Sequence, residues 1–168
     1  MSGTPDPACT YTLADGTPAP AASQKCARET FSPELVQREF YWQATEGPDQ
    51  LRQRVAWAWS QLFVVSNVKE GMAYGMADYQ QRLRDLAFGR FEDLLYMVAT
   101  HPMMGRMLDN DGNAKAQGGR QPNENFAREL LQLLTTGTVK LNPDGSAVLG
   151  SDGLPAPLYG QETISEMA

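Results

Sequence analysis

The sequence predicts a mostly α-helical fold: an irregular bundle of about five helices, a C-terminal β-hairpin at about residues 138–159, and an extended N-terminal arm. Apolar residues recur at helical spacing through the middle of the chain. Four prolines and two glycines fall within the first 20 residues, which disfavours any regular element there. We therefore expect an irregular arm over residues 1–30 and a helical domain over 31–168, a length sufficient for a core.

The helices are expected in the following order. Ser32 and Pro33 resemble a helix N-cap and first position, and this helix should reach about Thr45. The next helix, about 49–65, is apolar on nearly every side and should occupy the centre of the bundle. Further helices are expected over 71–88, 91–100, 103–108 and 122–136, with Pro102 breaking the chain between the second and third of these segments.

The last 30 residues follow a different pattern. Two short stretches, 139–141 and 147–149, flank the turn sequence Asn142-Pro143-Asp144-Gly145, which predicts the hairpin. We detect no internal repeat. The segment 161–168 starts another helix without completing an apolar stripe, so we expect the chain to stop inside a larger protein.

Charge and hydropathy exclude several classes of partner. The net charge is -6, and Lys and Arg are scattered among carboxylates instead of forming a basic face. Because a nucleic-acid binder needs such a face to neutralise phosphates, we expect no nucleic-acid partner. We also expect no membrane span, since no apolar run approaches the roughly 20 residues that a bilayer requires.

The two cysteines, Cys9 and Cys26, both lie in the N-terminal arm. A disulfide between them would close and restrain that arm, while the alternative is two unrelated free thiols. A zinc site is not indicated, because the chain has no CxxC motif and His101 is its only histidine.

Several segments together carry a family resemblance. The run Asn123–Leu131 (NENFARELL) resembles the signature of the bacterial domain-of-unknown-function 1800 family. Residues 52–55, 60–66, 101–104, 108–110 and 159–164 match further pieces of that family in the same order. The resemblance covers roughly residues 50–168. It implies an exported bacterial protein, encoded beside a second protein related to sulfatases and phosphatases, and it implies no particular reaction.

One polar constellation could carry chemistry. Asp109, Asn110 and Asn113 in a polar loop can meet Asn125 and Glu129, which lie four residues apart on the next helix. Carboxylate and amide oxygens of this kind suit a divalent cation such as calcium or magnesium. A carboxylate pair could instead act as general acid and base. The catalytic candidates are Glu129, Asn125 and Arg128, and the metal-ligand candidates are Asp109, Asn110, Asn113 and Glu129.

An architectural interpretation of the same residues is simpler. Asn123 is then the structural cap of the helix, and Glu124 pairs with Arg128 four residues later. His101, next to a proline, caps a helix end in preference to acting in catalysis. Tyr41, Trp42, Trp57 and Trp59 could stack on sugars if exposed, but their apolar surroundings in the sequence favour core packing. On the fifth helix, the expected buried stripe is Phe126, Leu130, Leu133 and Leu134.

Two functions follow from these interpretations. The first is a non-catalytic part of an exported bacterial protein that acts in protein interaction or assembly. The alternative is part of a hydrolase-like or metal-assisted site, built on the 123–129 helix and the polar loop before it.

Overall fold

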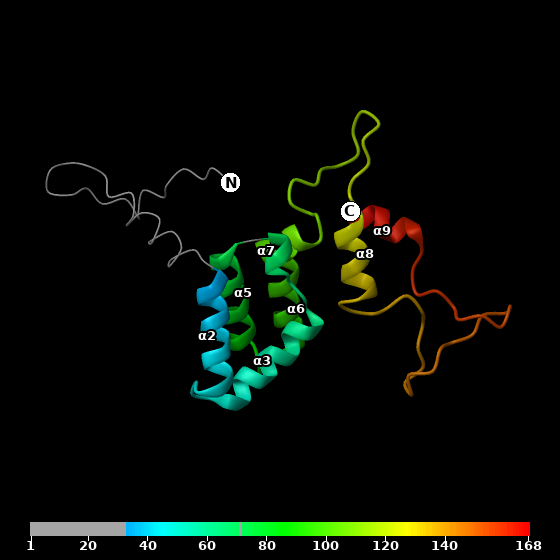
Figure 1. Ribbon diagram of the computed structural model, residues 1–168. Coiled ribbons are helices and arrows are strands. Elements are labelled where there is room, and N and C mark those ends of the chain that lie inside the picture. The colour runs from blue at the N-terminus through cyan, green and yellow to red at the C-terminus, as the bar shows by residue number, and fades with distance from the viewer. Residues whose placement is uncertain (1–32, 71) are drawn as a thin grey trace, which may run out of the picture. The chain divides into compact units, whose positions relative to one another are not determined.

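The computed structural model describes residues 33–70 and 72–168 (Figure 1). The helices there are α2 (Pro33–Thr45), α3 (Gln50–Leu62), α4 (Asn67–Glu70), α5 (Ala73–Asp85), α6 (Phe91–Thr100), α7 (Pro102–Met107), α8 (Asn125–Gln132) and α9 (Gln161–Met167). Within these ranges none has the length and apolar character that crossing a membrane requires. The predicted arm over residues 1–30, with Cys9 and Cys26, lies outside the described residues.

The expected bundle of about five helices is wrong. Eight helices form in the described ranges, and they belong to two compact units. The first unit contains residues 33–60 and 66–90, apart from residue 71, and the second contains 61–65 and 91–168. Helix α4, of four residues, offers too few positions for an apolar period to be recognised, whereas α9 forms where the sequence predicts the start of a helix.

In the first unit, α2 packs along α5 (Figure 1). The core is small and consists of Ala56, Ala73, Tyr79, Leu83 and Ala87. Side chains of α3 reach backbone carbonyls at the end of α5: Arg52 Nη1 donates to the Arg84 oxygen at 3.0 Å, and Trp59 Nε1 donates to the Ala87 oxygen at 3.3 Å. These bonds tie α3 to the end of α5.

The prediction that α3 is buried on all sides is wrong. Only Ala56 of this helix is buried, while Leu51 is 66% exposed and Trp57 is 53% exposed. The sequence contains enough apolar residues for a central helix, but the elements described in residues 33–60, 66–70 and 72–90 do not cover every side of it. The core-packing interpretation also fails for Tyr41, at 67% exposed, and for Trp42, at 49%.

In the second unit, α6 and α7 are separated at His101, the residue before the predicted break. Pro102 occupies the first position of α7, where its missing N–H has no helical partner to lose. The core contains Phe63, Leu94, Val98, Met103, Met104, Ala127, Leu134 and Ile164. Phe63 is fully buried and lies 6.1 Å from the Phe91 ring, between centroids.

Helix α8 is shorter than expected, which changes the face that it buries. It ends at Gln132, so Leu133 lies beyond the helix and is 62% exposed. Ala127, at 1% exposed, is instead the most buried residue of α8. The predicted stripe therefore holds for Leu134, which is buried, and is wrong for Leu133.

The predicted β-hairpin at 138–159 is also wrong. The described part of the chain has no strand, and this segment makes only isolated bridges: Val139 with Pro157, Leu141 with Ala147, and Leu149 with Pro155. Three extended stretches thus pair in turn, each with both of the others. A hairpin requires two stretches to pair along their length, whereas here each pairing stops after one bridge.

The hydrogen bonds of this segment repeat every eight residues. The Val148 N–H donates to the Lys140 oxygen, the Ala156 N–H to the Val148 oxygen, and the Lys140 N–H to the Ala156 oxygen, at 2.8–2.9 Å. These bonds close a ring, which we call the 138–160 ring. Our expectation of no internal repeat is therefore wrong here, because 140, 148 and 156 occupy equivalent positions.

The turns of the 138–160 ring use equivalent residues as well. Asp144 Oδ1 accepts from the Ser146 N–H at 2.9 Å, and Asp152 Oδ1 accepts from the Leu154 N–H at 3.0 Å. The glycine after each aspartate, Gly145 and Gly153, has φ of +84° and +76°. Glycine adopts this conformation without the steric cost that a Cβ brings.

Candidate functional site

Asn113 is the centre of the polar cluster predicted from the sequence, and all of its contacts lie in the second unit. Its Nδ2 donates to Asn110 Oδ1, to the Asn123 carbonyl and to the Ala168 carbonyl, at 3.0–3.2 Å. Its Oδ1 accepts from the backbone N–H groups of Asn123 and Ala114, at 2.8 and 3.1 Å. One amide thus connects the polar loop, Asn123 just before α8 and Ala168 after α9.

Asn123 and Asn125 form the entrance of α8. Asn123 Oδ1 accepts from the Asn125 N–H at 2.9 Å, satisfying one of the N–H groups that a helix start leaves unpaired. Asn125 Nδ2 reaches back to Asp109 Oδ2 and to the Leu108 carbonyl, both at 3.3 Å. Asp109 itself has φ of +59°, a left-handed conformation that aspartate tolerates better than most residues.

Glu124 joins α8 to α9. Its Oε1 accepts from the Ser165 hydroxyl at 2.6 Å, and its Oε2 accepts from Gln161 Nε2 at 2.6 Å and from Arg128 Nη2 at 3.0 Å. Arg128 also donates to Gln161 Oε1 at 3.3 Å. The hydrogen bonds from Ser165 and Gln161, helped by the charge of Arg128, hold the pKa of the Glu124 carboxyl below its ordinary value.

Glu129 differs from the other members of the predicted cluster. Its Oε2 is buried and has no hydrogen-bond partner, as is also true of the Tyr159 hydroxyl in the same unit. No hydrogen bond or ion pair of the described residues joins Glu129 to Asp109, Asn110 or Asn113. The structure therefore brings Asp109 together with Asn125, and Asn110 together with Asn113, without bringing Glu129 into either pair.

His101 is the buried N-cap of α7. It is 6% exposed, and its Nδ1 accepts from the Met103 N–H at 3.2 Å. An accepting Nδ1 carries no proton, so the ring proton lies on Nε2 in this arrangement. The sequence predicts that this residue caps a helix end, and in the structure it does so by accepting from a backbone N–H at the start of α7.

The arrangement as a whole is suited to holding backbone in place. Both carboxylate oxygens of Glu124 and both polar atoms of the Asn113 amide already have protein partners. Over residues 33–70 and 72–168, no group of three or more His, Cys, Asp or Glu side chains has the geometry to hold a metal ion. Gln161, Ser165 and Ala168, which complete the cluster, were not named from the sequence because they lie more than 30 residues from their partners.

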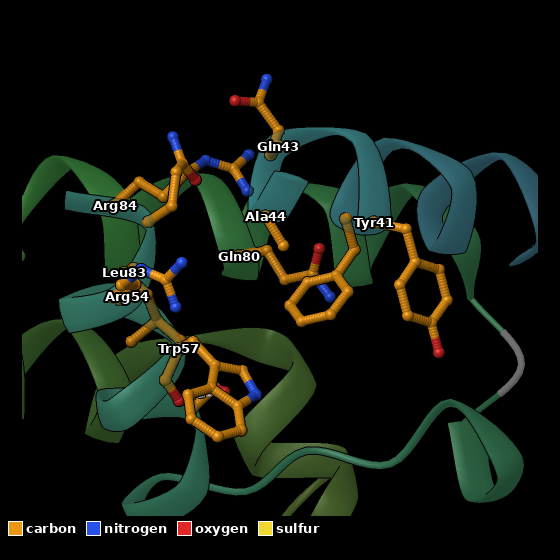
Figure 2. Close-up of a pocket in the computed structure, with 12 residues that line it drawn as sticks. Tyr41, Gln43, Ala44, Arg54, Trp57, Gln80, Leu83 and Arg84 are labelled. Atoms are coloured by element: carbon orange, nitrogen blue, oxygen red, sulfur yellow. Dashed lines mark hydrogen bonds between the residues drawn. The ribbon is translucent and has the colours of Figure 1, made fainter. Parts of the chain in front are cut away.

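Sequence reasoning also missed a cavity in the first unit. Its volume is about 420 Å³, and it is lined by α2, α3 and α5 (Figure 2). Exposed Tyr41 and Trp57 are among its lining residues. A smaller cavity of about 290 Å³ shares Phe40, Tyr41 and Gln80 with it. The signal that could have revealed these cavities is the excess of aromatic residues on α2 and α3 over what a small unit can bury.

Comparison with known proteins identifies the family. No curated protein and no solved structure matches the chain. A family model described as "Protein of unknown function (DUF1800)" matches residues 6–168, and the chain therefore belongs to the DUF1800 family.

Proposed function

We propose that this chain is an interaction module of an exported bacterial protein, and that its second unit presents an apolar surface to a partner protein. The observation that carries the proposal is the exposure of large apolar side chains on the 138–160 ring. Leu141 is 56% exposed, Leu149 is 61%, Leu154 is 63% and Leu158 is 39%. Monomeric proteins rarely expose several large apolar residues close together, and such groups often mark interaction surfaces.

The backbone of the ring supports this proposal. Its closed set of hydrogen bonds fixes the stretches that carry the leucines, so little conformational entropy remains to be lost on binding. Leu141 and Leu149 occupy equivalent positions of the eight-residue repeat. A rigid support for apolar side chains is what a protein interface requires at its centre.

The polar cluster supports the same proposal because the polar atoms of Asn113 and Glu124 already bond to the protein itself. A catalytic group needs a free lone pair or proton for its substrate. Asn113 and Glu124 use theirs on the protein itself, linking the polar loop, α8 and α9. We infer that the cluster stabilises the second unit, on which the ring is carried.

The family resemblance supplies a partner to test, namely the sulfatase- or phosphatase-related protein encoded beside such genes. The experiment is isothermal titration of that protein with the whole chain and with Leu141→Asp/Leu149→Asp. We expect the double variant to lose affinity at least about tenfold, because two apolar contacts would each be replaced by a desolvated charge. Leu133→Asp, an equally exposed position outside the ring, should bind like the parent. Equal affinity for all three proteins would refute the proposal.

The alternative is a hydrolase-like or metal-assisted site, and one observation favours it. The buried, unpartnered Glu129 Oε2 is an acceptor that a cation or a substrate proton could satisfy. In that case Asn125, Asp109 and Arg128 would supply further ligands or contacts. Glu129→Gln should then abolish any cation-dependent rise in the midpoint of thermal unfolding while leaving partner binding unchanged.

A further inference from the structure

The larger cavity of the first unit has the size and lining of a small-molecule site. Its volume of about 420 Å³ lies within the range of about 300–1,000 Å³ usual for such sites. The apolar part of the wall comes from all three long helices of the unit and consists of Phe40, Tyr41, Ala44, Ala56, Trp57 and Leu83. An apolar body could therefore leave water over most of its surface on entering.

The charged residues of the cavity have a single sign. Arg54 and Arg84 line it, and no aspartate or glutamate does, although the chain as a whole carries a charge of -6. Figure 2 shows both arginines toward the same end of the cavity, with Tyr41 toward the other end and Gln80 between them. The cavity is thus amphipathic, with a cationic end and an aromatic end.

The two guanidinium groups differ in how far they are already used. Arg84 Nη2 donates to Gln81 Oε1 at 2.8 Å. Burial lowers the pKa of the Arg84 guanidinium, and the nearby charges of Glu39 and Asp85 oppose that shift. Arg54 makes no hydrogen bond or ion pair with any residue in the described part of the chain. A guanidinium has five N–H donors in a planar fork, so both arginines retain donors for an anion.

We propose that this cavity binds a small amphipathic carboxylate, with its apolar body against Trp57, Phe40 and Leu83 and its carboxylate on Arg54 and Arg84. Guanidinium and carboxylate match in geometry and charge, and their hydrogen bonds are stronger than those between neutral groups. The apolar wall requires a body without many hydroxyl groups, which favours an aromatic or acyl chain over a sugar. The site lies in the first unit and is independent of the interaction proposed for the second.

The test is isothermal titration of the whole chain with four probes. The aromatic carboxylate is 2-naphthoate and the acyl carboxylate is decanoate, and the tighter of the two identifies the body that the cavity accepts. The uncharged analogue is 2-naphthylmethanol, and maltose represents a neutral sugar. We expect at least one carboxylate to bind, and to bind at least about tenfold more tightly than both neutral probes.

Matched variants connect the binding to the cavity. Arg54→Gln should weaken carboxylate binding about tenfold, because it removes one charged donor from an exposed residue without disturbing a protein contact. Arg38→Gln makes the same change of charge on exposed α2, away from both cavities, and should bind like the parent. The proposal is overturned if neither carboxylate binds, if a neutral probe binds as tightly, or if Arg54→Gln and Arg38→Gln have equal effects.

Discussion

Replacing Asn113 by alanine tests whether the polar cluster holds the second unit together. The substitution removes five hydrogen bonds, three donated by Nδ2 and two accepted by Oδ1. Nδ2 has only two hydrogens, so its three contacts count as about two good bonds. At about 0.5–1.5 kcal/mol net for each bond, with part of the loss recovered from water, we expect about 2–3 kcal/mol of destabilisation.

The assay is thermal unfolding followed by far-ultraviolet circular dichroism. For a chain of this length, about 2–3 kcal/mol corresponds to a fall in midpoint of about 4–12 °C. Asn110→Ala is the matched control, because its side chain contributes only one of the five bonds. It should lower stability by less than about 1 kcal/mol. Equal midpoints for Asn113→Ala and Asn110→Ala would refute the inference that Asn113 links the loop, α8 and α9.

Two further predictions concern the link between α8 and α9 and the 138–160 ring. Because folding lowers the pKa of Glu124 from 4.5, its contribution to stability is present above that pH and is lost as the pH falls through the folded pKa. Glu124→Gln should therefore flatten the decline in urea midpoint below pH 4.5. An equal decline in the variant and the parent would contradict the link between α8 and α9. Gly145→Ala should cost about 1–2 kcal/mol, because φ is +84° there, with no atom in the way of a Cβ. Gly160→Ala, at φ of -106°, should be nearly neutral in the same unfolding assay, and equal losses would contradict the ring geometry.

Much of the helical organisation could be predicted from the sequence. Proline and glycine stop or start helices through local sterics, so the break before Pro102 and the start of α2 at Pro33 lie close to where the sequence placed them. Burial could not be predicted as well. Apolar spacing on α3 shows that a helix can be buried, but whether other elements cover Trp57 depends on the tertiary arrangement.

The 138–160 ring shows a second limit. The Asp-Gly pairs at 144–145 and 152–153 correctly indicate turns. A turn does not, however, determine which stretches pair beyond it. Two stretches that flank one turn predict a hairpin, because pairing with each other is the simplest arrangement. The eight-residue spacing of the two Asp-Gly pairs was the available signal of a repeat.

For the candidate site, the sequence identified residues better than partners. Asn113, Asn123 and Asn125 were all singled out, and the structure joins them through side-chain hydrogen bonds to backbone and to Asp109. The contacts of Glu124 with Gln161 and Ser165 span about 40 residues of chain, and no local pattern encodes them.

The most direct test of the central claim, that the polar cluster stabilises the fold and does not hold a ligand, is thermal unfolding of the whole chain in calcium, magnesium, manganese or EDTA. We expect one midpoint in all four conditions, because Asn113 and Glu124 already have protein partners for their polar atoms. A midpoint that rises with cation concentration would show that the native state binds the ion. If Glu129→Gln abolished that rise, the account would be contradicted in favour of the metal-assisted site.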